Sequence, residues 1–433
     1  MPIVIISLLM ALIIAAVPVA AVLGILSLSL DEIFSRGRRS LMLGDFVWEQ
    51  SIEYILVAIP MFILLGEIML RAGIALRMYN AVIQWLSWLP GGLMHANIGS
   101  CALFAASSGS SVATAATVGT VAYPEIEKRN YNEKLFLGSL AAGGTLGILV
   151  PPSINLIIYG LLTDTSVPEL YLAGIFPGIT LALLFMAVIV VACLWRPAFD
   201  GDKIETTWES RIKVLPDLLP PVLLFMAVVG SIYAGVATPT EAASIGVCFA
   251  LIIAAWNKAL NIRMLKEAFE GTMRSTAMIM LIILAAVFLN FVLGFMGVTQ
   301  TILEAIKELG WTPMQTMIVI ICFYLLLGMF METLSMMLTT IPVVFPIVVY
   351  LGFDPVWFGI MITVLMEAAL ITPPIGINLY VVHGIRARGG KFNDVSIGAV
   401  PFLFGMFFLI AILLFFPDIA TWLPQLVYPS GTG

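Results

Sequence analysis

A stretch that occurs twice decides the fold of this chain. Residues 145–160 read TLGILVPPSINLIIYG, and residues 369–384 read ALITPPIGINLYVVHG. Each copy contains a proline pair, Pro151-Pro152 or Pro373-Pro374, inside an apolar run. A proline pair lacks two backbone donors and cannot continue a helix, so nearby carbonyl groups lose their partners. Inside a membrane, such groups occur where they line a protein cavity, and matched breaks in two halves indicate the binding site of a secondary transporter.

The composition indicates that most of the chain lies in a lipid bilayer. Of the 433 residues, 61% are hydrophobic and 11% are charged, and the mean hydropathy is +1.08. We therefore predict an all-α protein with many membrane spans. The net charge of −6 is not accompanied by a basic patch, so nucleic acid is not an expected partner, whereas membrane lipids are. Apolar runs long enough to span are found at 3–30, 52–70, 168–195, 218–237, 279–298 and 401–423.

Residue types that carry metal or covalent chemistry are scattered. His95 and His383 are solitary, and the four cysteines lie in apolar segments without CxxC spacing. The sequence has no phosphate-binding loop and no Ser/His/Asp set. We therefore expect reduced core cysteines, no catalytic residue and no cofactor. The first helix lacks a basic n-region, so we interpret it as a retained span rather than a cleaved signal peptide.

The repetition extends over most of the chain. Pro124 in TVAYPEI and Pro346 in VVFPIVV are separated by the same number of positions as the two proline pairs. We predict a first repeat at 1–195 and a second at 217–425, joined by a polar linker at 196–216. Within the repeats we expect scaffold helices at 1–95 and 218–298, a hairpin and broken helix at 96–162 and 315–385, a connecting helix at 168–195 and a last helix at 396–425.

Basic residues predict the orientation. If the two repeats are inverted and the linker is cytoplasmic, most of the 20 Lys and Arg fall in cytoplasmic loops. A bias of this kind supports inversion. Lys307 and the cluster of Arg36, Arg38 and Arg39 are exceptions to this bias.

A second unusual segment precedes each break. Residues 98–124 are rich in Ser, Thr, Ala and Gly around SSGSS, and residues 319–346 carry a glutamate in GMFMETLS. Each segment is too polar in its middle for an ordinary span. We therefore predict two re-entrant hairpins with tips near the midplane. For the Ser/Ala run alone, tight helix packing through small residues is the alternative.

The oxygen atoms available at the breaks suit a small hard cation, and we expect Na⁺ as the coupling ion. Freed carbonyl groups, together with Ser, Thr or Glu oxygens, form an oxygen cage. The helix N-termini after the proline pairs favour an anion. The expected ligands are Ser107, Ser110, Gly147, Val150 and Pro152 in one sodium site, and Gly328, Glu332, Ala369, Thr372 and Pro374 in the other. The expected substrate contacts are Asn155, Tyr159 and Asn378, with Tyr380 as a further donor.

Carboxylates in or beside apolar runs require an explanation, because a charge at a helix centre costs about 3 kcal/mol on insertion scales. Glu241, in TPTEAA, is interpreted as a capped helix start. Glu67 is expected to pair with Arg71 across one helical turn. Glu332 lies at a predicted hairpin tip and Glu367 lies five residues before Thr372, so we favour a site role for both.

Together these motifs resemble the large membrane subunit, of the DctM type, of tripartite ATP-independent periplasmic (TRAP) transporters. The resemblance implies an ion-transporter-type fold with inverted repeats, two re-entrant hairpins and two discontinuous helices, working as an elevator. The matching segments are AIPMFILLGEIM (58–69), FAASSGSSVATAATVGTVAYP (104–124), GGTLGILVPPSINLIIYG (143–160), LAGIFPG (172–178), ATPTEAASIG (237–246), GMFMET (328–333) and MEAALITPPIGINLYVVHG (366–384).

The resemblance also implies a function and partners. It implies a sodium-coupled importer of a small organic anion, such as a C4-dicarboxylate or sialic acid, in the bacterial inner membrane. It implies a separate small four-helix membrane subunit of the DctQ type and a periplasmic substrate-binding protein of the DctP type. This chain would then be an unfused large subunit.

Alternatives from other classes stay open at this point. A transporter of the same fold group that needs no binding protein would share the two breaks. An ion channel would explain the polar hairpins. An intramembrane enzyme would need a base beside the serines at 107–111, and the sequence supplies none. Neighbouring genes for a secreted binding protein and a four-helix membrane protein would distinguish a TRAP transporter from all three.

Overall fold

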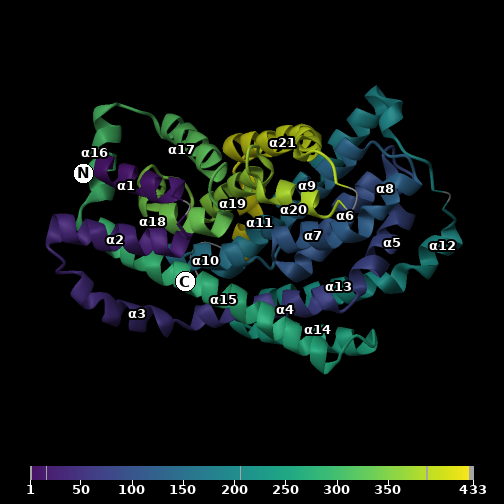
Figure 1. Cartoon of the computed structure of the whole chain (residues 1–433), viewed down its shortest axis with the longest axis horizontal. Helices are drawn as coiled ribbons and strands as arrows, with labels where there is room; N and C mark the ends of the chain where they lie inside the picture. The colour runs from purple at the N-terminus through teal and green to yellow at the C-terminus, as the bar shows by residue number, and fades with distance from the viewer. Residues whose placement is uncertain (1, 16, 205, 387–388, 429–433) are drawn as a thin grey trace.

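The computed structural model describes residues 2–15, 17–204, 206–386 and 389–428. These residues form α-helices, three short 3-10 helices and no strand, as the apolar runs predict (Figure 1). The 3-10 helices are η1 (Ser40–Met42), η2 (Tyr54–Val57) and η3 (Pro197–Phe199). The first α-helices are α1 (Pro2–Ile14), α2 (Val19–Ser35), α3 (Leu43–Ser51), α4 (Ala58–Arg71), α5 (Ile74–Leu86), α6 (Gly92–Ser108), α7 (Ser111–Ala122), α8 (Pro124–Lys128), α9 (Glu133–Leu149), α10 (Ile154–Thr163) and α11 (Val167–Trp195).

The remaining helices begin in the predicted linker and continue through the second half. The linker at 196–216 contains η3 and a short helix, α12 (Trp208–Lys213). The later helices are α13 (Leu215–Tyr233), α14 (Pro239–Trp256), α15 (Ile262–Phe295), α16 (Val298–Glu308), α17 (Pro313–Gly328), α18 (Thr333–Tyr350), α19 (Pro355–Ile371), α20 (Ile377–Gly384), α21 (Phe392–Phe415) and α22 (Asp418–Val427).

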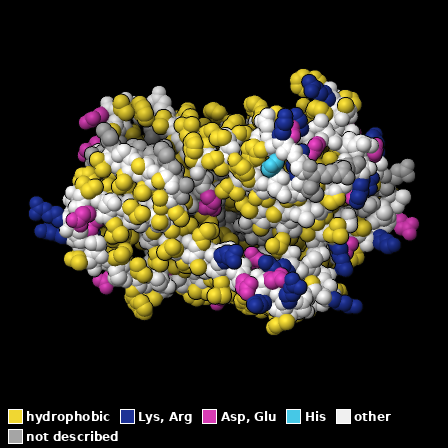
Figure 2. Space-filling model, in the orientation of Figure 1, with side chains coloured by type: hydrophobic (Ala, Val, Ile, Leu, Met, Phe, Trp, Pro, Cys, Tyr) yellow, Lys and Arg dark blue, Asp and Glu magenta, His cyan; other side chains and the backbone are white. Residues whose placement is uncertain are grey.

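The described residues include seven helices that are long and apolar enough to cross a membrane. The bent pair α9 and α10, with 42° between the two helices, would make an eighth span. Hydrophobic side chains cover the middle of the face in Figure 2, with most Lys and Arg toward its sides and lower rim. The chain is therefore a polytopic α-helical membrane protein.

One predicted span is wrong. The apolar run at 3–30 forms two helices, α1 and α2, which pack against each other. Pro18 is the residue before α2, with φ −55° and ψ 138°. A proline with an extended backbone interrupts a helix. Because proline has no N–H to bond, it is tolerated where the next helix begins. Hydropathy alone cannot detect this division, because both helices are apolar.

The elements of the second half repeat those of the first at the predicted spacing. Helices α9 and α19 both have 17 residues, and their starts at Glu133 and Pro355 are as far apart in sequence as the two proline pairs. Helices α7 and α18, which start at Ser111 and Thr333, have the same separation. Helix α6 ends shortly before α7 and packs on it, and α17 does the same with α18, so that each of these two pairs forms a hairpin.

The helices form two groups. In the first, α9 contacts α6, α7, α11, α19, α20 and α21, and α19 also contacts α10, α17 and α18. In the second, α4 and α15 pack on each other, α14 packs on α4, α2 packs on α15, and α13 packs on α14. Figure 1 shows α19, α20 and α21 above, and α4, α13 and α14 along the lower side. We call these sets the hairpin group and the outer group.

The hairpin group is larger than the predicted unit at 96–162 and 315–385, because α11 and α21 also pack on α9. The closest approach is between Gly138 of α9 and Gly398 of α21, where a Cβ atom on either glycine would overlap the other helix backbone. Small residues allow membrane helices to approach in this way. The contact joins residues far apart in sequence and belonging to different halves.

An ion-pair cluster closes one end of this group. Arg386, with only 4% of its side chain exposed, has Nη2 2.6 Å from Glu133 Oε1 at the start of α9. Its Nη1 lies 3.6 Å from Asp394 Oδ2 and donates to the Lys391 carbonyl at 3.1 Å. Lys134 pairs with Asp394 at 3.4 Å. The cluster therefore joins α9 to the start of α21 and to the segment that precedes it.

Arg386→Gln is expected to lower the free energy of unfolding by about 1.5–3 kcal/mol, because hydrogen bonds between charged groups contribute about that much. Thermal unfolding of the detergent-solubilised protein measures the loss. The matched control is Lys128→Gln, which removes a pair with Glu125 in which the lysine side chain is 65% exposed. Exposed pairs contribute about 0–1 kcal/mol. Equal losses of unfolding free energy in the two variants would contradict a stabilising role for the Arg386 ion pairs.

Candidate functional site

The two breaks begin with the same backbone conformation. At the first, α9 ends before Val150, which is extended (φ −75°, ψ 122°), and the Pro151–Pro152 peptide is cis. At the second, α19 ends before Thr372 (φ −88°, ψ 121°), and the Pro373–Pro374 peptide is cis. They differ in exposure, since Pro152 is buried and Pro374 is exposed. The N-cap residue of the helix that follows is Ser153 for α10 and Gly376 for α20, the latter with a left-handed φ of +50°.

The tip of the first hairpin packs directly on the first break. A Cβ atom at Gly147 would lie 2.7 Å from the Ser110 carbonyl oxygen, and one at Gly109 would lie 3.0 Å from the Pro152 oxygen. Ser111 Oγ donates to the Thr145 carbonyl at 3.0 Å. The backbones of the tip and the break are therefore in contact, with no room for a side chain between them.

Of the first predicted sodium ligands, the structure brings Ser110 against Gly147, and Pro152 against Gly109, the neighbour of Ser110. Ser110 precedes α7, and its side chain accepts from the Ala113 amide at 3.4 Å. The Ser107 hydroxyl is buried and donates to the Phe104 carbonyl of its own helix at 2.8 Å. Val150 is the residue at which α9 ends, and its amide is bonded to the Leu146 carbonyl at 3.0 Å.

The second tip meets the second break at fewer predicted positions. A Cβ atom at Gly328 would overlap the Ala369 side chain, so these two residues are in contact. Gly328, Ala369 and Glu332 border one cavity of about 380 Å³, which Thr372 and Pro374 do not line. The Thr372 hydroxyl donates to the Ala368 carbonyl at 2.6 Å.

Glu332 has a role that its sequence context did not lead us to predict. Its Oε2 accepts hydrogen bonds from the Ser335 amide at 3.2 Å and the Ser335 hydroxyl at 3.1 Å. It is therefore the N-cap of α18, a position that favours side chains able to accept from the first turn. Ser110 caps α7 at the corresponding position of the first repeat. The repeat spacing itself was the signal that would have identified this cap.

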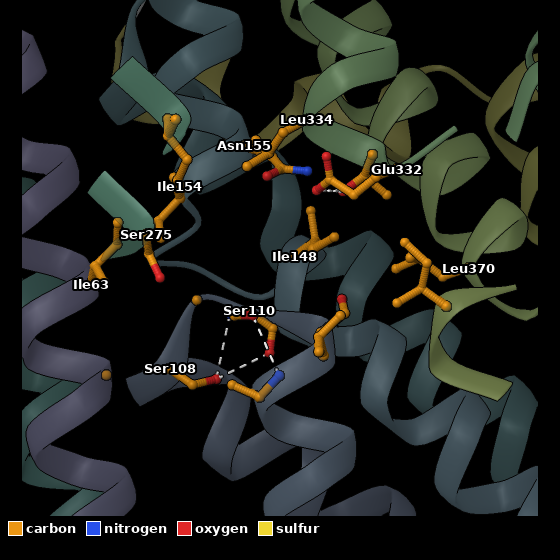
Figure 3. Close-up of a pocket in the computed structure, with 18 of the residues that line it drawn as sticks. Ile63, Ser108, Ser110, Ile148, Ile154, Asn155, Ser275, Glu332, Leu334 and Leu370 are labelled. Carbon is orange, nitrogen blue, oxygen red and sulfur yellow. Dashed lines mark hydrogen bonds between the residues drawn. The ribbon is translucent and has the colours of Figure 1, made fainter. Parts of the chain in front are cut away.

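A cavity of about 310 Å³ lies between both hairpin tips and the outer group. Figure 3 shows Ser108 and Ser110 at one side of it, Asn155 and Glu332 at another, and Ile63 and Ser275 on the outer helices. Residues of α4, α15, both tips and both breaks line it together. Ser108, Ser111 and Ser275 were not predicted as site residues, and only their polarity within apolar surroundings distinguishes them.

Only one of the three predicted substrate residues lies in this cavity. Asn155 is 4% exposed, and its Nδ2 has no hydrogen-bond partner among the described residues. In Figure 3 the polar end of Asn155 points toward Glu332. An amide donor without a partner at a cavity wall is available to a ligand, because a buried unpaired donor is costly.

The other predicted donors are engaged elsewhere. The Tyr159 hydroxyl donates to the Pro355 carbonyl at 2.7 Å, and Asn378 Nδ2 donates to the Ala141 carbonyl at 3.2 Å. Both side chains hold helices of the hairpin group together and do not line the cavity. Tyr380 is 52% exposed and stacks on Phe392, with ring centroids 4.4 Å apart. Repeat position alone could not predict where these side chains point.

The cavity wall on the outer group carries an ion pair. Glu67 lines the cavity and pairs with Arg71, as predicted, and Arg71 lies 3.8 Å from Glu267. The Glu67 carboxylate rests on α15, where a Cβ atom at Gly271 would lie 2.8 Å from it. Glu241 is also confirmed as a cap, since it forms a reciprocal capping box with Thr238.

The described residues contain no group of three His, Cys, Asp or Glu side chains that could hold a metal ion. A cation at the breaks would therefore need carbonyl and hydroxyl oxygens as its main ligands. The last turn of a helix has carbonyl groups without intrahelical partners. Close backbone approach at Gly109 and Gly147 places the tip beside these groups, so the donor set fits Na⁺.

Comparison with known proteins agrees with this architecture. Residues 6–419 match the family model described as "Tripartite ATP-independent periplasmic transporter, DctM component". The chain also resembles the solved structure of the Alcanivorax borkumensis YdaH transporter, with a TM-score of 0.66 and 15% identity over 98% of this chain and 99% of that one. At that identity the likeness concerns the fold alone.

Curated relatives are similar over nearly the whole length. The chain is 33% identical over 400 residues to the C4-dicarboxylate TRAP transporter large permease protein DctM of Vibrio cholerae, covering 87% of this chain and 86% of the relative. It is 32% identical over 376 residues to the ectoine TRAP transporter large permease protein TeaC of Halomonas elongata, covering 86% and 87%. It is 30% identical over 381 residues to the sialic acid TRAP transporter large permease protein SiaM of Vibrio cholerae, covering 88% of each. This chain therefore belongs to the DctM component family of tripartite ATP-independent periplasmic transporters, and it is a membrane transport protein rather than an enzyme.

Proposed function

We propose that this chain is the transport-conducting subunit of a sodium-coupled importer for a small organic anion. One observation carries the proposal: each helix break is met by a hairpin tip, and both tips border one cavity against the outer group. Freed carbonyl groups bind a cation, while the N-terminus of α10 and the unpaired Asn155 amide favour an anion. The two ligands would therefore meet at the same breaks.

Two sodium sites are proposed, one at each break. A bound Na⁺ would place a positive charge beside the substrate. Its contacts with both the hairpin tip and the break would hold these two segments together. The residues proposed to hold it are Ser107, Ser110, Gly147, Val150 and Pro152 at the first break, and Gly328, Glu332, Ala369, Thr372 and Pro374 at the second. The contacts of Ser110 with Gly147 and of Gly328 with Ala369 support the two sets.

The substrate is proposed to carry a carboxylate. The named relatives act on C4-dicarboxylate, ectoine and sialic acid, all of which contain a carboxylate group. In this chain, Asn155 Nδ2 and the hydroxyl groups of Ser110 and Ser275 are neutral donors at the cavity wall. Neutral donors and a helix N-terminus can bind an anion without a fixed cation.

We further propose that the hairpin group moves as one body across the outer group, as in an elevator, in a chain built of inverted repeats at 1–195 and 217–425. The cavity between the two groups supports this, because movement along that boundary would carry the ligands with the tips. A small four-helix DctQ-type subunit and a DctP-type periplasmic binding protein are the proposed partners. Exposed apolar side chains on α13, including Leu219, Leu223 and Met226, offer a surface for the subunit or for lipid.

The first test is uptake by proteoliposomes that contain this chain and its small partner. We expect accumulation only with an inward sodium gradient and with the binding protein outside. A tenfold gradient contributes about 1.4 kcal/mol per ion, and one net charge adds about 2.3 kcal/mol at 100 mV. Two ions and one charge give about 5 kcal/mol, enough for a few-thousandfold accumulation. Equal uptake without sodium, or without the binding protein, would disprove the proposal.

A second test addresses the sodium ligands. Ser110→Ala and Thr372→Ala should each raise the sodium concentration for half-maximal uptake by about three- to tenfold, because one lost oxygen ligand is worth about 1 kcal/mol. Thr120→Ala is the control, since Thr120 is exposed on α7 and donates only to the Ala116 carbonyl. Unchanged sodium dependence in both site variants would exclude these residues as ligands.

A further inference from the structure

One buried carboxyl group takes no part in the contacts described so far. Glu367 of α19 has an exposed fraction of 0%, and neither of its carboxyl oxygens has a hydrogen-bond partner among the described residues. The other carboxylates of the apolar segments are all engaged. Glu67 pairs with Arg71, Glu241 caps α14 and Glu332 caps α18.

Glu367 lies where the two broken helices pack together. Helices α9 and α19 pack on each other, and the Glu367 carboxyl group lies close to the backbone amide of Leu149, the last residue of α9 before the first break. Along its own helix, Glu367 precedes the second break by five residues. The corresponding position in α9 is Thr145, also buried, whose carbonyl accepts the Ser111 hydroxyl of the first tip. The carboxyl group is therefore beside the end of one broken helix and close to the end of the other.

Among the described helices packed on α19, no basic side chain is placed to balance a charge on Glu367. Among the described helices that pack substantially on α19, only α9 and α20 contain basic residues, Lys134 and His383. Lys134 is 15 residues before Leu149, about 22 Å along the helix, and it pairs with Asp394 at 3.4 Å. His383 is in the last turn of α20, beyond the second break.

A sodium ion held only by carbonyl and hydroxyl oxygens lacks a negative charge beside it, just as Glu367 lacks a positive one. It brings a full positive charge into a region of low dielectric, where neutral dipoles only partly compensate it. The ligand set proposed at the first break contains no carboxylate. A buried carboxylate without a cation is costly in the same way, so placing the two charges together removes both penalties.

We propose that Glu367 is the buried counter-charge of the sodium ion at the first break. The inference rests on the proposed sodium coupling, and it adds the one carboxylate that the first ligand set lacks. Glu367 reaches this ion from α19, whereas the other ligands come from α6, the tip of the first hairpin, the end of α9 and the first break. A residue of the second half therefore controls the affinity of the sodium site in the first half.

The test measures sodium binding rather than transport. The full chain with its small partner is purified in detergent, and sodium-dependent thermal stabilisation and ²²Na⁺ binding are titrated against choline. Glu367→Gln, nearly the same size but uncharged, should raise the half-saturating sodium concentration at least tenfold, or about 1.4 kcal/mol. Glu367→Asp keeps the charge and should shift the half-saturating sodium concentration less. The aspartate variant replaces the glutamine variant if the latter does not fold.

Asp31→Asn is the matched control for losing a buried carboxylate. Asp31 is fully buried on α2, where Oδ2 accepts from the amides of Arg39 and Ser40 at 3.1 and 2.8 Å. This variant should lower the unfolding temperature without changing the sodium concentration required. Equal sodium binding by the unmodified protein and Glu367→Gln would overturn the proposed role of Glu367 but not the sodium coupling. Absence of sodium binding by the unmodified protein would overturn both the sodium coupling and this inference.

Discussion

Backbone carbonyl groups set free inside a membrane must find partners within the protein, and this constraint shapes the whole chain. The proline pairs at 151–152 and 373–374 create the need twice. In each half a hairpin tip comes to the break, through backbone contacts at Gly109 and Gly147 and through the contact of Gly328 with Ala369. The hairpins exist as polar segments within an apolar chain because their tips meet these polar breaks.

The breaks and tips can only meet if the helices that carry them are held together as one body. Tyr159 and Asn378 contribute by bonding to carbonyl groups of α19 and α9. The approach of Gly138 to Gly398 brings α21 onto α9, and Arg386 closes the end of the group with ion pairs. The resulting body faces the outer helices across a cavity in which Asn155 offers a free donor.

Much of this architecture was predictable from local signals. Proline pairs, turn residues and the constant spacing between the two repeats identified the breaks and both hairpins, because each depends on the chemistry of adjacent residues. The pairing of Glu67 with Arg71 and the cap at Glu241 were also correct, since both lie within one helical turn. The capping of α18 by Glu332 is equally local, and it was not predicted because Glu332 was considered only as a sodium ligand.

Long-range packing was not predictable in this way. Nothing near Tyr159 or Asn378 in the sequence indicates that each side chain reaches a carbonyl of the other half. The division of the first apolar run at Pro18 was missed because hydropathy measures polarity and not backbone direction. The packing of α11 and α21 on α9 depends on contacts such as Gly138 with Gly398, which join distant positions.

If the hairpin group moves across the outer group during transport, as proposed, a reversible crosslink between the two groups will stop uptake. Gly66 on α4 and Ser108 at the first tip touch across the boundary, since a Cβ atom at Gly66 would lie 3.0 Å from the Ser108 carbonyl oxygen. In a chain without its native cysteines, Gly66→Cys with Ser108→Cys should stop uptake when oxidised and restore it when reduced. Leu65→Cys with Gly246→Cys, a neighbouring contact within the outer group, should leave uptake unchanged. Full uptake by the oxidised Gly66 and Ser108 pair would contradict movement of the hairpin group across the outer group.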